Sequence, residues 1–419
     1  MSSPGPRRTI ALLSGLALLF VAGCSTAADD RPGGSSGLIT GPGITDTTIQ
    51  LGALTDLTGP YAALSSSIVN AQQLAVDEIN EAGGICGRSL EMVVRDHGYD
   101  VQQALGAYTE IGPTVAAMPQ LLGSPILAAL LDDLAADEML TFPQSWDSTL
   151  LGRPEIQIPG NTYDVDMINA IDFLVRGAHL AEGDAIGHVY FENEYGENAL
   201  RGAEFAAESA GVTIVEQRVS PTDQDMTAQV AALRAADVTA VLLSAGPAQT
   251  ASFVGVAAAG GWEVPVVGNT PAYASQLLET AVAPALTEMF FMVSGAPAAS
   301  SEIPGVQALV ESYRAAYPDA DIDGGVLSGY GVLQFLADAL RIACEQGDLS
   351  RAGIIAAHRT QGLVEGDLGM AMDFSDPDRP PSFDSYVLRP EVGAAGGLVQ
   401  VEPAGRASTV DDYVFPPTG

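Results

Sequence analysis

The chain has 419 residues and carries 17 basic residues, all of them arginine, against 52 acidic residues, so its formal net charge is −35. The absence of lysine excludes a P-loop nucleotide site and a Schiff-base enzyme, because both need a lysine amine. The acidic excess argues against nucleic-acid binding, which needs a basic surface. An apolar fraction of 47% is typical of a well-packed globular protein, and the length favours two domains.

The first residues are typical of an export signal. Arg7 and Arg8 precede an apolar run of 13 residues, Ile10 to Ala22, which is too short to span a membrane. The run ends in Val-Ala-Gly followed by Cys24, which resembles the bacterial lipobox, where cleavage precedes a lipidated cysteine. We expect a signal peptide over residues 1–23 and a flexible Ser/Gly/Pro-rich tether over residues 24–45. The mature charge would then be 15 − 52 = −37.

From residue 48 onward, short β-rich runs alternate with helical runs. The predicted strands are residues 49–54, 90–94, 185–191, 212–215, 238–244 and 264–267, and helical periodicity marks residues 69–82, 205–210, 253–259 and 332–343. Glycines separate several helices from the strands that follow them. This β-α-β alternation predicts parallel sheets covered by helices on both faces. More than 350 residues of it predict two doubly wound α/β lobes.

Motifs for catalysis, cofactors and metals lack their structural context. Residues 33–37 match Gly-x-Ser-x-Gly but lie in the tether, without the strand that a nucleophile elbow needs. Asp319, Asp321 and Asp323 resemble the start of an EF-hand loop, yet its twelfth position is Tyr330 and not glutamate. The four histidines are not spaced as metal ligands, and no dinucleotide-binding glycine fingerprint follows a strand. We therefore expect a protein that is not an enzyme and has no metal or cofactor.

Three segments carry a resemblance to a known family. Residues 54–61 (LTDLTGPY), 75–85 (AVDEINEAGGI) and 193–197 (NEYGE) are similar, in order and spacing, to the periplasmic leucine/isoleucine/valine-binding proteins of ABC importers. The resemblance covers about residues 46–402. It implies the type I clamshell, two lobes joined by a three-strand hinge. The implied N-terminal lobe is residues 46–160 and 295–372, the C-terminal lobe is residues 161–294 and 373–402, and residues 403–419 are a tail, with crossings near Gly160, Ser294 and Asp373.

The same resemblance implies where a ligand binds. Loops after the third and fourth strands would hold its carboxylate, and Tyr195 would close over it from the second lobe. The implied first-lobe residues are Gly123, Ser124, Gln144, Ser145 and Trp146. Ser124 precedes Pro125, which also suits the start of a helix without any ligand. Trp146 is expected to be either a ligand-contacting wall or ordinary loop packing.

Two positions depart from the family. Thr270 stands where the family has a carboxylate for the ligand ammonium, and Gly246 stands where it has an aromatic residue. Asp56 is a candidate substitute for that carboxylate. Because a buried ammonium without a counter-charge is costly, an aromatic or aliphatic carboxylate or an amide is as suitable a ligand as an amino acid.

We therefore expect a monomeric, lipid-anchored, extracytoplasmic protein that delivers a small solute to an ABC permease and its ATPase subunits. A ligand sensor for a signalling partner is the second hypothesis, and an exported hydrolase the third. Beyond Cys24, two cysteines remain, Cys86 and Cys344, in a compartment that permits disulfides. The resemblance places both in the same lobe, so we expect them to be bridged, with two buried free thiols as the alternative.

Overall fold

The computed structural model describes residues 37–418, so the expected signal peptide, Cys24 and the first part of the tether lie outside it. Residues 37–45, which we had assigned to the tether, contact the first lobe instead. Leu38 is buried, and β1 (Ile39–Thr40) pairs in parallel with β11 (Asp348–Leu349). The apolar side chain of Leu38 explains why residues 37–45 lie against the first lobe, because its burial stabilises that contact.

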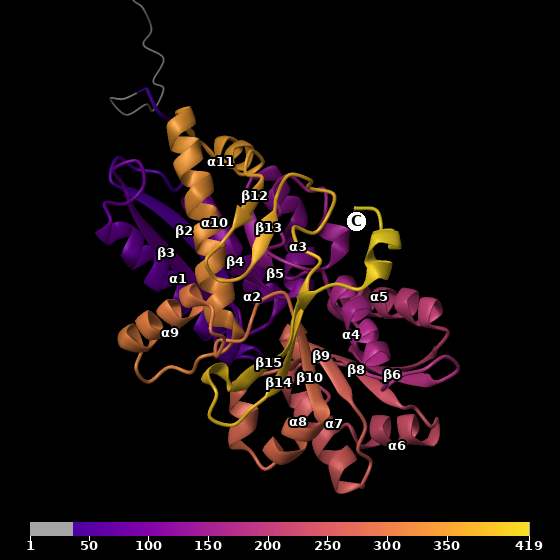
Figure 1. Cartoon of the computed structure of the whole chain (residues 1–419). Coiled ribbons are helices and arrows are strands. Elements are labelled where there is room, and N and C mark those ends of the chain that lie inside the picture. Colours follow the sequence, from indigo (N-terminus) through magenta and orange to yellow (C-terminus); the bar gives the residue numbers. More distant parts are fainter. Residues whose placement is uncertain (1–36, 419) are drawn as a thin grey trace, which may run out of the picture.

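The first lobe is built on a four-stranded parallel sheet with the strand order β3-β2-β4-β5 (Figure 1). Its strands are β2 (Thr48–Thr55), β3 (Ser89–Asp96), β4 (Ala117–Leu122) and β5 (Thr141–Gln144). Every residue of β4 is buried. Helices cover both faces of this sheet, which is why its central strands read as continuous apolar runs and not as alternating ones.

The helices of this lobe come from two distant parts of the chain. They are α1 (Ala62–Glu81), α2 (Val101–Ile111), α3 (Ser124–Ala136), α9 (Pro304–Ala316), α10 (Gly324–Gln346) and α11 (Arg351–His358). α1 begins seven residues before its expected start at Val69, because its serine-rich first turns lack apolar periodicity. α10 is long and apolar enough to cross a membrane, but about two-thirds of the apolar window is buried inside the protein, as in a core helix.

The second lobe has a seven-stranded sheet with the order β15-β14-β10-β9-β8-β6-β7. The strands are β6 (Ala185–Phe191), β7 (Thr213–Val219), β8 (Ala240–Ser244), β9 (Val266–Asn269), β10 (Phe290–Ser294), β14 (Ser385–Pro390) and β15 (Leu398–Gly405). The helices are α4 (Tyr163–Arg176), α5 (Glu194–Ala210), α6 (Thr227–Ala235), α7 (Pro247–Ala259) and α8 (Ala283–Met289). The prediction of two α/β lobes with parallel sheets is confirmed, and β6 has its predicted bounds.

The end of the chain is part of the second lobe. β14 and β15 add to the sheet in antiparallel orientation, which the β-α-β pattern did not predict. A short connection suffices for an antiparallel pair, whereas a parallel pair needs a crossover helix. Residues 403–419 were expected to be a tail, but β15 continues to Gly405, and Ala407 and Val410 are buried against the second lobe.

The chain passes between the lobes three times: between β5 and α4, between β10 and α9, and between β13 and β14. β13 (Ala371–Asp373) pairs with β12 (Leu363–Glu365) in a separate antiparallel ribbon. The crossings predicted near Gly160, Ser294 and Asp373 fall within or at the edge of these three segments.

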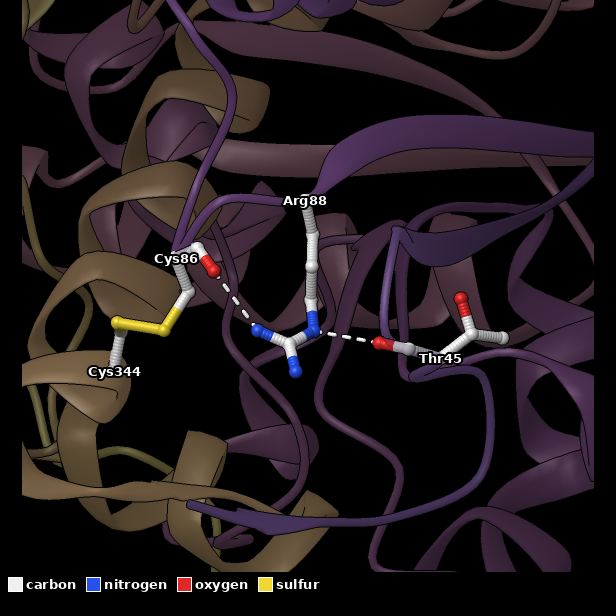
Figure 2. Close-up of a disulfide and its surroundings, with 4 residues drawn as sticks. All are labelled: Thr45, Cys86, Arg88 and Cys344. Atoms are coloured by element: carbon white, nitrogen blue, oxygen red, sulfur yellow. Dashed lines mark hydrogen bonds between the residues drawn. A yellow bond between two sulfur atoms is a disulfide. The ribbon is translucent and has the colours of Figure 1, made fainter. Parts of the chain in front are cut away.

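The expected disulfide is present. Figure 2 shows Cys86, in the turn after α1, bonded to Cys344 near the end of α10, with their Cα atoms 5.9 Å apart. Cys86 has a positive φ of 57°, and Arg88 Nη1 donates to its carbonyl at 2.8 Å while Arg88 Nε donates to the carbonyl of Thr45. The bridge therefore joins the two parts of the chain that together make the first lobe.

Candidate functional site

A cavity lies where the two lobes face each other, and we call it the interlobe cavity. Its walls are loops that follow the carboxyl ends of strands β2 to β6 and β9, together with the start of α10. This is the edge of an α/β sheet where ligands bind. The lining residues are Tyr61, Leu64, Ile68, Tyr99, Leu122, Gly123, Ser124, Gln144, Trp146, Tyr163, Tyr195, Thr270, Pro271, Gly324, Gly325 and Ser328.

Five aromatic side chains line this cavity. The ring centroids of Tyr163 and Tyr195 are 4.5 Å apart, those of Tyr61 and Tyr99 are 5.2 Å apart, and those of Trp146 and Tyr163 are 5.9 Å apart. These spacings are typical of favourable aromatic pairs. Trp146 comes from the first lobe and Tyr163 from the second, so the aromatic contacts hold the two lobes together around the cavity.

The tyrosine hydroxyls in the cavity are neutral donors. Burial raises the pKa of Tyr61, Tyr99, Tyr163 and Tyr195 well above the ordinary tyrosine value. Each hydroxyl therefore keeps its proton at any physiological pH and can donate it to an acceptor. The Tyr195 hydroxyl donates to Asn269 Oδ1 at 2.5 Å, which fixes its ring against the second lobe.

Polar groups from the first lobe meet at one end of the cavity. Ser145 Oγ donates to Ser124 Oγ at 2.8 Å, and Ser124 is the first residue of α3. The side-chain nitrogen of Gln144 is buried without a hydrogen-bond partner among the described residues. A helix N-terminus, a hydroxyl and a free amide nitrogen together present donors to an anionic or neutral acceptor.

None of the residues of the described chain that line this cavity carries a formal charge.

Gly123 lies at the start of α3 with a φ of 108°, and a Cβ there would lie 2.9 Å from Tyr99 Cε2. Any side chain at this position would push Tyr99 out of place, so glycine is required for the shape of the wall.

Six of the nine residues proposed from the sequence line the cavity: Gly123, Ser124, Gln144, Trp146, Tyr195 and Thr270. Trp146 packs against Tyr163 and its Nε1 donates to the carbonyl of Pro143 at 3.2 Å. Thr270 Oγ1 lies 3.5 Å from Ser294 Oγ. The structure thus gathers these side chains from both lobes into one space.

The other three proposed residues have different positions. Both carboxylate oxygens of buried Asp56 accept backbone N–H groups, Oδ1 from Gly59 at 2.5 Å and Oδ2 from Tyr61 at 2.9 Å. Asp56 therefore shapes the loop that presents Tyr61 and does not line the cavity. Ser145 is buried behind Ser124, and Gly246 is the N-cap of α7 beside Gln249.

The sequence reasoning missed several lining residues. Tyr61 ends the family-like segment 54–61, and Tyr163 follows the first crossing. The sequence therefore contained a pattern near each of them that could have identified it as a cavity residue. Tyr99 lies in the loop after β3 and packs against Tyr61, and it was not predicted from the sequence. The start of α10 had no signal, because it reaches the cavity only when α10 packs on α1 in the folded lobe.

A second cavity adjoins the first at the crossings, and we call it the hinge cavity. It shares Trp146, Thr270, Gly324 and Ser328 with the interlobe cavity. The two spaces therefore have part of their walls in common.

Comparison with known proteins places the chain in a family. A family model described as "Periplasmic binding protein" matches residues 48–396. A fatty acid ABC transporter substrate-binding protein from Thermomonospora curvata has 45% sequence identity, covers 92% of this chain and 99% of its own, and superimposes with a TM-score of 0.90. A branched chain amino acid ABC transporter protein from Thermus thermophilus with bound valine has 17% identity, coverage of 88% and 99%, and a TM-score of 0.74.

Among curated relatives, Leu/Ile/Val-binding protein homolog 8 of Brucella abortus (strain 2308) is 24% identical over 297 residues, covering 67% of this chain and 73% of that protein. The match to the family model and the two-lobe fold agree with the resemblance in the sequence. The chain therefore belongs to the type I periplasmic binding proteins of the branched-chain amino acid family, the extracytoplasmic substrate-binding proteins of ABC transporters.

Proposed function

We propose that this protein is the lipid-anchored, monomeric binding protein of an ABC importer and that its ligand is an apolar carboxylic acid of the fatty-acid class. The observation that carries the proposal is the wall of the interlobe cavity, which consists of aromatic, aliphatic and neutral hydrogen-bonding side chains. Such a wall suits a mostly apolar ligand with one small polar group. The relative with 45% identity, a fatty acid ABC transporter substrate-binding protein, supports the same class.

The interlobe cavity offers little to an amino acid ammonium. Thr270 occupies the position of the family's carboxylate, and both oxygens of Asp56 already accept backbone hydrogen bonds. An ammonium placed here would lose its hydration without gaining a counter-charge, at several kcal/mol in general estimates. This favours a ligand without an amino group.

A carboxylate can be held here by neutral donors. Ser124 lies at the N-terminus of α3, a helix of 13 residues, and the Gln144 side-chain nitrogen has no partner within the described chain. Helix N-termini and charge-assisted hydrogen bonds stabilise anions without a cationic side chain. We place the ligand carboxylate at this end and its apolar chain along the aromatic side chains.

Binding between the lobes explains how the ligand would be carried. A ligand that contacts Trp146 on one lobe and Tyr195 on the other favours the closed arrangement of the lobes, because its contacts with both exist only there. The closed, loaded protein would then be the form that the permease recognises.

The test is calorimetric titration of protein that has been stripped of co-purified lipid. We expect saturated acids such as decanoate and dodecanoate to bind in the micromolar range or tighter and to raise the melting temperature. Leucine, isoleucine and valine should give no measurable heat. Micromolar binding of leucine together with silence of the acids would contradict the proposal.

A matched pair of variants sharpens this test. Thr270→Asp places a carboxylate in the cavity and should weaken the binding of the acids by about tenfold or more through like-charge repulsion. Thr213→Asp makes the same change at an exposed position of β7, outside the cavity, and should leave affinity unchanged.

The anchor is tested separately. Cys24→Ala should abolish lipid attachment and release a folded protein from the membrane fraction. A variant that keeps its place in washed membranes after signal cleavage would contradict the lipoprotein proposal and leave the proposal about the ligand intact.

A further inference from the structure

The hinge cavity has one apolar wall and one polar wall. All three crossings between the lobes contribute to it or lie beside it. The apolar wall consists of Val332 and Phe335 on α10 together with Met370 and Met372. The polar wall includes Asn161, at the first crossing, and Asp166 on α4. The two walls face a space that adjoins the interlobe cavity, and four residues line both spaces.

On the polar wall, one acceptor lacks a partner. The side-chain nitrogen of Asn161 donates to the carbonyl of Asp384 at 2.9 Å and to Ser385 Oγ at 2.8 Å. These bonds fix which side of the amide carries the oxygen, and Asn161 Oδ1 has no hydrogen-bond partner, although Asn161 is only 2% exposed. This oxygen points toward Gly295, another lining residue, where a Cβ would lie 3.4 Å from it.

Beside this oxygen lies a carboxyl group without a cation. Asp166 is 1% exposed, its Oδ1 is 3.4 Å from the side-chain nitrogen of Asn161, and none of the ion pairs within residues 37–418 includes it. Burial raises the pKa of Asp166 to about 8, so the group is largely a neutral acid at pH 7. The polar wall thus needs hydrogen bonds and not a charge.

We propose that the hinge cavity receives the far end of the ligand chain and that this end carries a hydroxyl group, bonded to Asn161 Oδ1 and Asp166. The inference rests on the proposed function, since it requires a carboxylic acid whose chain runs from Ser124 toward the hinge. A hydroxyl is neutral, donates one hydrogen bond and accepts others, and joins directly to an alkyl chain that the methionines and Phe335 can contact. A plain alkyl chain would leave the Asn161 oxygen buried and unpaired, which is unfavourable.

The experiment compares matched pairs of ligands. Linear acids of about six to about sixteen carbons and their ω-hydroxy analogues are titrated calorimetrically into lipid-free wild-type protein. Sites that hydrogen-bond a ligand hydroxyl discriminate strongly against analogues that lack it. At the chain length that fits, we expect the hydroxy acid to bind about tenfold tighter or more.

Two variants locate the effect. Asp166→Leu keeps a similar volume and removes part of the polar wall, so the preference for the hydroxy acid should fall to about threefold or less. The plain acid should still bind. Asp172→Leu makes the same change on α4 but outside both cavities, where Asp172 pairs with Arg176, and should keep the full preference. Thermal unfolding reports whether each variant is folded, and if Asp166→Leu is not, the wild-type comparison alone decides.

The outcomes are separable. Equal affinity for both members of every pair would overturn this inference, since water would then be the partner of Asn161. The proposed function would still stand. Tighter binding of ω-amino acids than of ω-hydroxy acids would also overturn it, because the site would then recognise a cation. Silence of both acid series would overturn the proposed function and this inference with it.

Discussion

The two lobes are stabilised in different ways. The first lobe is assembled from residues 37–158 and 304–373, segments far apart in the sequence, and Cys86–Cys344 joins them covalently. The second lobe contains no cysteine and depends on a seven-stranded sheet, which the β14–β15 hairpin extends at one edge. Both lobes combine two separated segments of the chain, and the first has a cross-link that reduces the ordering entropy its assembly must overcome.

The lobes also contribute differently to the cavity. The first lobe supplies the start of α3, Trp146 and the start of α10, whereas the second supplies Tyr163, Tyr195, Thr270 and Pro271. The cross-linked lobe therefore holds most of the wall. We therefore expect the first lobe to hold the ligand first and the second lobe to close over it.

The largest expected effect tests the cross-link. Replacing Cys86 and Cys344 together by alanine should lower the free energy of unfolding of the first lobe by about 2–5 kcal/mol, because the unfolded chain regains the freedom that the bridge removes. Neither cysteine lines either cavity, so affinity should change by no more than about threefold. Denaturant unfolding and calorimetry measure the two quantities.

Alkylation followed by intact mass measurement under non-reducing conditions provides the control. Two alkylated thiols on the denatured wild-type protein would show that the bridge does not form, and would remove the contrast between the lobes.

The next effect compares one residue from each lobe. Trp146→Ala should weaken ligand binding by about 2 kcal/mol, or about thirtyfold, because it removes a first-lobe aromatic wall. Tyr195→Phe keeps the second-lobe ring and removes the hydroxyl that bonds to Asn269. The free energy of ligand binding should therefore weaken by about 1 kcal/mol. A larger loss from Tyr195→Phe than from Trp146→Ala would reverse the assignment of binding surface and closing lobe.

A pH-dependent effect belongs to the second lobe. Burial raises the pKa of Asp166 to about 8 in the folded protein, above the ordinary value of 3.8. The folded state thus holds a proton that the unfolded state releases, and this contribution to stability is full below pH 4 and is lost as the pH rises toward 8. Relative to Asp166→Asn, wild-type stability should fall with rising pH by at most about 1.4 kcal/mol per unit.

Chemical unfolding of both proteins at several values between pH 5 and 8 measures this slope. Parallel stability curves for wild type and Asp166→Asn would mean that Asp166 titrates normally despite its burial.

The smallest effect concerns the segment after β15. The Tyr413 hydroxyl donates to Asp164 Oδ2 at 3.0 Å, and Thr418 Oγ1 donates to the carbonyl of Leu151, so the segment contacts both lobes. Tyr413→Phe should lower the free energy of unfolding by about 1 kcal/mol. Asp164 keeps other donors, among them Ser148 Oγ at 2.5 Å. A loss above about 3 kcal/mol would show that the hydroxyl is essential to the contact between the lobes.

Much of the architecture follows from local patterns. Period and glycine placement located the starts of β2, β3 and β6 to β9 to within two residues, because buried parallel strands are apolar runs between breakers. β4, β5 and β10 were not among the predicted strands. Two of the three family-like segments, 54–61 and 193–197, contribute a residue to the cavity, Tyr61 and Tyr195. Export and even parity pointed to the Cys86–Cys344 bridge, because a cysteine pair in an oxidising compartment usually forms a bond.

The roles of individual polar side chains depended on tertiary structure. Asp56 was a candidate for the ligand ammonium, yet its oxygens accept the N–H groups of Gly59 and Tyr61. Residues after 403 appeared in the sequence as a tail, yet Ala407 and Val410 are buried. The hinge cavity unites Asn161, Gly295 and Met372 from three stretches of chain. Local periodicity determines strands and helices because their hydrogen bonds are short-range, whereas a side chain's partners are set by which distant segments pack together, and no local pattern contains that information.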